Sequence, residues 1–126
     1  MSREAAGRTV LVVDDDDALR MLCRVNLELD GYRVLEAATV DEAAAHTESE
    51  RVDVVLLDVR LGDTSQGGLA LLDRLPAGEH GPAVALLTGS IDRSRFTQPD
   101  RVAAVISKPF ALEELADVVR RLAASV

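Results

Sequence analysis

The sequence predicts an α/β fold in which a parallel sheet is covered by helices on both faces. Short aliphatic runs alternate five times with segments of helical periodicity, and the connections between them are short. Two of the runs, 10–13 and 54–57, contain apolar residues only, which is typical of strands buried on both faces. Strands that alternate with helices through short connections pair in parallel. Periodicity leaves the order of the strands in the sheet open.

Five segments are expected to form strands because each is a compact, mainly apolar run bounded by polar or turn-forming residues. In chain order they cover 10–13, 32–37, 54–58, 82–87 and 102–107. The first stops at four consecutive aspartates, 14–17, and the third stops at a single carboxylate, Asp58.

Five further segments are expected to form helices, and in chain order they cover 18–29, 40–50, 69–75, 91–99 and 112–122. Asp16 or Asp17 can cap the first helix, and Thr39 with Glu42 forms a capping pattern in front of the second. Segment 91–99 has a weak apolar stripe and ends at a proline, so we expect a short or irregular helix there. The stripe of the first helix consists of Leu19, Leu22, Val25, Asn26 and Leu29.

Composition and charge exclude several classes of function. The net charge of −8 argues against nonspecific binding to nucleic acids or anionic membranes, since both require basic surfaces. Cys23 is the only cysteine, so no internal disulfide forms, and a buried hydrophobic role suits it better than a nucleophilic one. No apolar stretch approaches the roughly 20 residues of a membrane helix, and the polar lead 1–8 lacks the apolar segment of a signal peptide. We expect one cytoplasmic domain over 9–126.

Polar side chains stand at the ends of four of the five expected strands. The first strand is followed by Asp14 and Asp15, the third ends at Asp58, the fourth is followed by Thr88, and the fifth by Lys108. The carboxyl ends of parallel strands meet at one edge of a sheet, where open α/β folds place their sites. We therefore expect three carboxylates, a hydroxyl and an ammonium group to face a common crevice.

This set of side chains predicts phosphoryl transfer. Clustered carboxylates repel one another unless a cation is bound or their pKa values shift. Oxygen ligands alone suit a hard ion, above all Mg²⁺. Asp58 can then attack phosphorus to form an aspartyl phosphate, Lys108 can neutralise a phosphoryl oxygen, and the Thr88 hydroxyl can donate a hydrogen bond to another.

Four short motifs, by their order and spacing, resemble the response regulator receiver domains of two-component signalling. They are Val-Val-Asp-Asp at 12–15, Leu-Leu-Asp at 56–58, Leu-Leu-Thr-Gly at 86–89 and Ser-Lys-Pro-Phe at 107–110. The resemblance covers 9–124. It implies a flavodoxin-like three-layer sandwich of five helices around a five-stranded parallel sheet in the order 2-1-3-4-5.

The resemblance also implies a role for each residue of the expected site. Asp58 would be the phospho-acceptor, Thr88 the switch hydroxyl and Lys108 the lysine that pairs with the phosphate. The Lys108–Pro109 peptide would be cis, as in many relatives. The ligands of Mg²⁺ would be Asp14, Asp15, Asp58 and the backbone carbonyl of Arg60.

The function implied is a phosphorylation-dependent switch that accepts its phosphoryl group from a sensor histidine kinase or a phosphotransfer protein. It would not be an enzyme, apart from Mg²⁺-dependent self-phosphorylation and slow autodephosphorylation. The signal would reach an output domain or a downstream partner through the face formed by the fourth helix, the fifth strand and the fifth helix, and a homodimer is compatible with this arrangement.

Some positions depart from the family pattern and keep an alternative open. Val105 stands where the family usually has Tyr or Phe, Gly62 stands where Pro is common, and the loop 62–68 is about two residues longer than usual. A phosphorylation-independent interaction module is therefore the second hypothesis. An aspartate-nucleophile phosphatase is a third, but Arg60 occupies the place of its usual second acid. A flavin carrier is weaker still, because an aspartate run would repel the phosphate of the flavin.

Overall fold

A computed structural model of the protein describes residues 7–61, 67–76, 81–89 and 101–124. Five parallel strands form one sheet in the order β2-β1-β3-β4-β5, which confirms the expected α/β fold and strand order. The strands are β1 (Thr9–Val13), β2 (Arg33–Ala37), β3 (Val54–Asp58), β4 (Ala83–Thr88) and β5 (Ala104–Ser107). The helices within the described residues are α1 (Asp17–Leu29), α2 (Val40–Ser49), the 3-10 helix η1 (Gly67–Arg74) and α3 (Leu112–Ala124). The helix expected over 91–99 lies outside the described residues.

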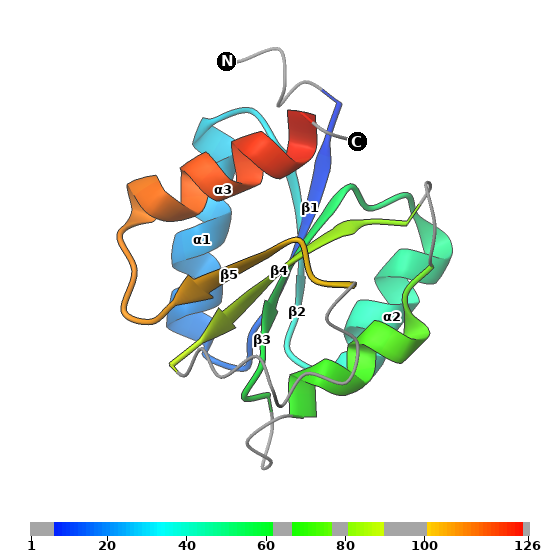
Figure 1. The fold of residues 1–126 in the computed structure, drawn as a ribbon. Helices are drawn as coiled ribbons and strands as arrows, with labels where there is room; N and C mark the ends of the chain where they lie inside the picture. Colours follow the sequence, from blue (N-terminus) through cyan, green and yellow to red (C-terminus); the bar gives the residue numbers. More distant parts are fainter. Residues whose placement is uncertain (1–6, 62–66, 77–80, 90–100, 125–126) are drawn as a thin grey trace.

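The sheet separates two hydrophobic clusters, because successive side chains of a strand point to opposite faces. Helices α1 and α3 cover one face, and α2 and η1 cover the other (Figure 1). In β3, for example, Val54 and Leu56 belong to the cluster beneath α1 and α3, whereas Val55 and Leu57 belong to the cluster beneath α2 and η1. Both faces of the central strands are thus buried, as their uninterrupted apolar runs predicted.

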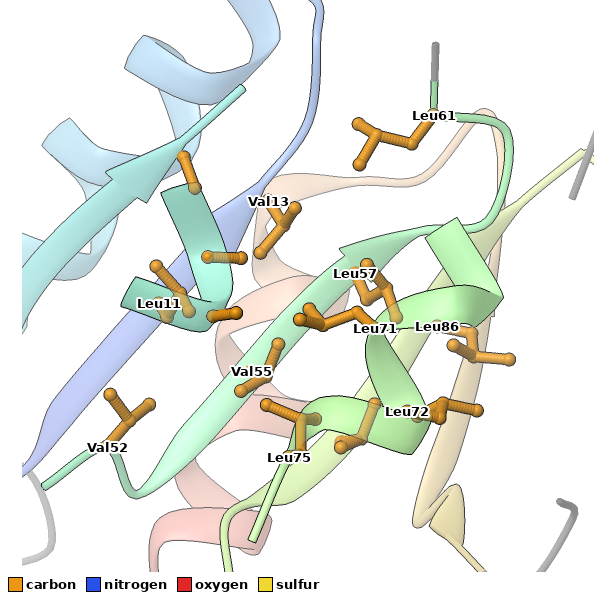
Figure 2. Close-up of a cluster of buried hydrophobic side chains, with 14 of the residues drawn as sticks. Leu11, Val13, Val52, Val55, Leu57, Leu61, Leu71, Leu72, Leu75 and Leu86 are labelled. Carbon is orange, nitrogen blue, oxygen red and sulfur yellow. The ribbon is translucent and has the colours of Figure 1, made fainter. Parts of the chain in front are cut away.

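The third expected helix is a 3-10 helix that begins at Gly67, two residues earlier than expected. A 3-10 helix has three residues per turn, so positions three apart align. Leu71 and Leu72 of η1, and Leu75 directly after it, are buried against the sheet in the cluster that contains Val55, Leu57 and Leu86 (Figure 2). The side chains that fill this cluster are aliphatic, in keeping with the aromatic-poor sequence.

The expected capping signals are present at both α1 and α2. The side chain of Asp16 accepts hydrogen bonds from the backbone N–H groups of Ala18 and Leu19, so Asp16 is the N-cap of α1. At α2, the Thr39 hydroxyl accepts from the Glu42 N–H at 3.1 Å. These local bonds fix where each helix begins after its strand.

Most of the apolar stripe expected for α1 does not face the core, although Leu19 is half-buried and packs against the cluster beneath α1 and α3. Cys23 and Leu27 are the buried residues of this helix, whereas Leu22, Val25 and Leu29 are 46%, 40% and 78% exposed. The helix has apolar residues on two neighbouring faces, and only its position against β1 and α3 decides which face is buried. Met21 also lies on the surface, so α1 carries an exposed apolar stripe of Met21, Leu22, Val25 and Leu29.

Candidate functional site

The strands end in step at one edge of the sheet. Val13 pairs with Leu57, Asp58 with Leu87, and Thr88 with Ser107, so Asp14 and Asp58 lie at the same level and Lys108 lies two positions further along, after β5. The Lys108 N–H donates to the Thr88 carbonyl at 2.8 Å, which ties the end of β5 to the end of β4. The expected residues are therefore brought together by backbone pairing that the sheet already requires.

Alternation along the strands gives three charged side chains the same orientation. Asp14, Asp58 and Lys108 continue the direction of the residues two positions earlier. Those earlier residues belong to the cluster beneath α1 and α3: Val12, Leu56 and Ile106. Lys108 Nζ lies 3.5 Å from Asp14 Oδ2 and 3.5 Å from Asp58 Oδ1, so the ammonium group bridges two carboxylates from different strands.

A third carboxylate completes this cluster. Ligand oxygens of Asp14, Asp15 and Asp58 all lie within 4.8 Å of one another. Asp14 and Asp58 are buried, while Asp15 is exposed and faces the open side of the edge. The cluster thus has two oxygens held inside the protein and one reachable from solvent.

Backbone groups hold one oxygen of each buried carboxylate. Asp14 Oδ1 accepts from the Asp16 N–H at 2.9 Å, and Asp58 Oδ1 accepts from the Arg60 N–H at 3.1 Å. Within the described residues, Asp14 Oδ2 is buried and accepts no hydrogen bond. A buried carboxylate oxygen that lacks a donor and lies near two other carboxylates fits a hard divalent cation.

The electrostatics of the cluster follow from burial and like charge. Burial, and secondarily the charge of Asp14, raise the pKa of Asp58, while Lys108 and the Arg60 N–H act in the opposite direction. Burial also raises the pKa of the nearby Cys23 thiol to about 11, again assisted by Asp14. Cys23 is buried, which confirms its expected place in the hydrophobic core.

The other expected residues take varied positions. Thr88 is buried at the end of β4, Arg60 is exposed, and the Lys108–Pro109 peptide is cis. Val105 is half-buried and packs against the cluster beneath α2 and η1. Gly62 and the neighbouring loop residues 63–66 lie outside the described residues.

Gly68 is a residue of the site that sequence reasoning placed only in a loop. Its N–H donates to the Val59 carbonyl at 2.9 Å, and a Cβ at this position would lie 2.0 Å from the backbone carbonyl oxygen of Asp58. The start of η1 therefore packs directly on the backbone of the central carboxylate. Two adjacent glycines before an apolar segment are a weak signal of such a close approach.

A family model described as the response regulator receiver domain matches residues 10–120. The chain belongs to this family. It is 37% identical over 97% of its length to the probable transcriptional regulatory protein TcrX of Mycobacterium tuberculosis, of which it covers 52%. The receiver thus spans about half the length of the curated relatives it matches first.

Solved structures agree with the receiver fold. A CheY-like response regulator receiver domain protein from Methanospirillum hungatei JF-1 superposes with a TM-score of 0.81 at 30% identity, over 94% of this chain and 95% of that one. The response regulator TrrA of Thermotoga maritima, in complex with Mg²⁺ and BeF, has a TM-score of 0.78 at 25% identity, over 91% of this chain and 98% of that one.

Membership of the family gives the receiver its general role, a phosphorylation-dependent switch of two-component signalling. In the part of the chain that the structure describes, no helix is both long and apolar enough to span a bilayer.

Proposed function

We propose that this receiver, over 9–126, accepts a phosphoryl group on Asp58 from a sensor histidine kinase or a phosphotransfer protein, and that the transfer requires Mg²⁺. The observation that carries the proposal is the position of Lys108 Nζ, 3.5 Å from Asp14 Oδ2 and 3.5 Å from Asp58 Oδ1. An ammonium group between two carboxylates is placed to pair with an oxygen of a phosphoryl group attached to one of them. An incoming phosphoryl group would therefore contact both the Asp58 carboxylate that attacks it and the Lys108 ammonium group that neutralises its charge.

A carboxylate oxygen of Asp58 is the nucleophile in this reaction. It forms a bond to phosphorus while the bond between phosphorus and the donor's imidazole nitrogen breaks, and the electron pair leaves with the imidazole, which is then protonated. Bound Mg²⁺ would neutralise charge on the phosphoryl oxygens. Attack of water on phosphorus later breaks the bond to the Asp58 oxygen, releases inorganic phosphate and returns Asp58 to its carboxylate, in a step that we propose is slow.

The surrounding residues take the remaining roles. Lys108 pairs with one phosphoryl oxygen, and the Thr88 hydroxyl donates to another when the switch is phosphorylated. The carboxylate cluster, in which Asp14 Oδ2 is buried and accepts no hydrogen bond, supports a divalent cation at this edge, as does the Mg²⁺-containing complex of the related TrrA. The proposed ligands of the ion are Asp14, Asp15, Asp58 and the backbone carbonyl of Arg60.

The exposed apolar stripe on α1 supports a protein as the phosphoryl donor. The helix begins at Asp17, two residues after Asp15, so the stripe runs along α1 from its second turn and its first members, Met21 and Leu22, are those nearest the edge that holds the carboxylates. Exposed apolar side chains grouped beside a reactive site suit the docking of another protein. A histidine-bearing donor that binds there would be directed at Asp58.

We propose that the signal leaves through the face formed by β5 and α3, toward an output domain or a separate partner, with a homodimer as one form. Relatives about twice as long as this chain have room for an output domain. Val105, which replaces the usual aromatic residue on β5, is half-buried and packs on aliphatic neighbours, so the readout on this face would not use an aromatic side chain of that strand.

A phosphoryl mimic tests the proposed switch against a phosphorylation-independent interaction module, the second hypothesis, which Val105 favours. With Mg²⁺ and beryllofluoride, the amide NMR signals of the carboxylate edge are expected to shift, and so are those of β5 and α3. In Asp58→Asn, which lacks the acceptor, we expect no such response. Shifts confined to the residues that touch the mimic would favour the interaction module, and an unchanged response in Asp58→Asn would contradict the acceptor assignment.

A further inference from the structure

Arg20 is a half-buried residue of α1 that sequence reasoning did not single out. Its Nη1 donates to the backbone carbonyl of Asp14 at 2.7 Å, its Nε to Glu36 Oε1 at 3.2 Å, and its Nη2 to Asp17 Oδ1 at 2.6 Å. One guanidinium group thus connects the end of β1, the strand β2 and the first turn of α1. Its side chain is 15% exposed.

The carbonyl that Arg20 binds belongs to the peptide between Asp14 and Asp15. Rotation of this peptide would move both carboxylates relative to Asp58, because each acid is attached to one end of it. The Asp14 N–H is already fixed on the Ala37 carbonyl at 3.0 Å. That N–H belongs to the preceding peptide, between Val13 and Asp14, so the bond from Arg20 restrains the next peptide through its carbonyl. A planar guanidinium held by two carboxylates is a rigid donor.

We propose that Arg20 is a positioning residue for the acid pair, and that it holds the Asp14–Asp15 peptide in the orientation that Mg²⁺ requires. The inference rests on the proposed metal site. Groups one layer outside the ligands orient them, and their loss weakens metal binding by about tenfold or more. Arg20 acts on the backbone between two ligands, so its removal affects both at once.

Charge and geometry predict opposite results at this position. Arg20 is a cation close to a cation site, so by Coulomb repulsion alone its removal would tighten the binding of Mg²⁺. A positioning role predicts that removal weakens binding. A lysine retains the charge but not the planar set of donors, so it separates the two effects.

The matched control is Arg24, one turn further along α1. Arg24 Nη1 bonds to Glu36 Oε2 at 2.8 Å, so it shares an acidic partner with Arg20. Among the described residues, Arg24 pairs with Glu36 and Glu28 and does not bond to the Asp14 backbone. Arg24→Gln therefore removes a comparable ion pair on the same helix and leaves the restraint on the acid pair in place.

The experiment is a titration of the metal-free protein with Mg²⁺, followed by amide NMR and calorimetry, for wild type, Arg20→Gln, Arg20→Lys and Arg24→Gln. We expect about tenfold weaker binding in both Arg20 variants and unchanged affinity in Arg24→Gln. The amide signals of Asp15 and Asp16 should shift in both Arg20 variants before any Mg²⁺ is added, which a loss of stability alone would not produce.

Unchanged or tighter binding in the Arg20 variants would overturn the positioning role. A wild-type protein that binds no Mg²⁺ would instead contradict the proposed function, so the two failures are distinguishable. Arg20→Lys retains charge and helix propensity, and it decides the question should Arg20→Gln not fold.

Discussion

Replacement of Gly68 by alanine is expected to destabilise the protein by about 2 to 3 kcal/mol, the upper range for an added atom in a packed site. The new Cβ would lie 2.0 Å from the Asp58 carbonyl oxygen, 3.1 Å from the Asp58 carbonyl carbon and 3.2 Å from the Val59 carbonyl oxygen. These are backbone atoms of a buried strand end, and they cannot rotate away as the tip of a side chain can. Either η1 or the backbone of Asp58 must shift.

The measurement is urea unfolding in the presence of EDTA, with Gly89→Ala as the control. Gly89 lies one residue after Thr88, and a Cβ there meets nothing within 4 Å. The same substitution at Gly89 should be nearly neutral, or stabilising by about 0.5 kcal/mol through the lower entropy of the unfolded chain. Equal unfolding free energies for Gly68→Ala and wild type would show that η1 does not pack on Asp58 as described.

Asp58→Asn is expected to stabilise the metal-free protein at neutral pH by about 1 kcal/mol, a typical size for a single substitution. Burial and the charge of Asp14 raise the pKa of Asp58, so the folded state holds its proton more tightly than the unfolded chain does. Stability therefore falls as the pH rises from the unfolded pKa through the raised folded pKa, and the penalty is complete above it. Asparagine removes the charge and the penalty together.

Unfolding free energies from about pH 8 down to about pH 4, measured in EDTA, test this pH dependence. The advantage of Asp58→Asn should be largest at the high end and should shrink as Asp58 of the wild type becomes protonated. Asp117→Asn is the control, because it neutralises an exposed carboxylate that pairs with Arg120 on the surface of α3. Its effect should stay within about 0.5 kcal/mol. A constant or growing advantage toward low pH would contradict the electrostatic origin.

Addition of Mg²⁺ should reduce the stability advantage of Asp58→Asn over the wild type. A ligand that binds only the folded state stabilises it by mass action, and the wild type retains all three carboxylates for the ion. On this account the charge of Asp58 lowers the stability of the metal-free domain, and binding of the proposed ion would offset that loss.

The sheet and its edge could be predicted because strand periodicity and strand ends are local properties of the sequence. The apolar runs predicted the strands. Parallel pairing of these strands brings Asp14, Asp58 and Lys108 to one edge of the sheet, and this does not depend on where the helices begin and end. The order of the strands needed the resemblance to a known family, because periodicity does not encode it.

The remaining features depend on contacts between distant segments. The side of α1 that is buried could not be predicted, because apolar residues occupy two of its faces and tertiary packing selects the one with Leu27. The position of Arg20 in the sequence does not reveal its contacts. They arise because the fold places Asp14, at the end of β1, and Glu36, in β2, beside it. The need for glycine at position 68 could not be predicted either, because it arises only where the start of η1 packs on the backbone of Asp58.

The central claim is that Asp58 carries the phosphoryl group, and chemical mapping tests it most directly. The protein is incubated with acetyl phosphate or phosphoramidate and Mg²⁺, the acyl phosphate is reduced with borohydride, and the resulting homoserine is located by peptide mass spectrometry. We expect the intact protein to gain one phosphoryl group, homoserine to appear at position 58, and both to be absent in Asp58→Asn or with EDTA. Homoserine at Asp14 or Asp15, or undiminished labelling of Asp58→Asn, would contradict the account.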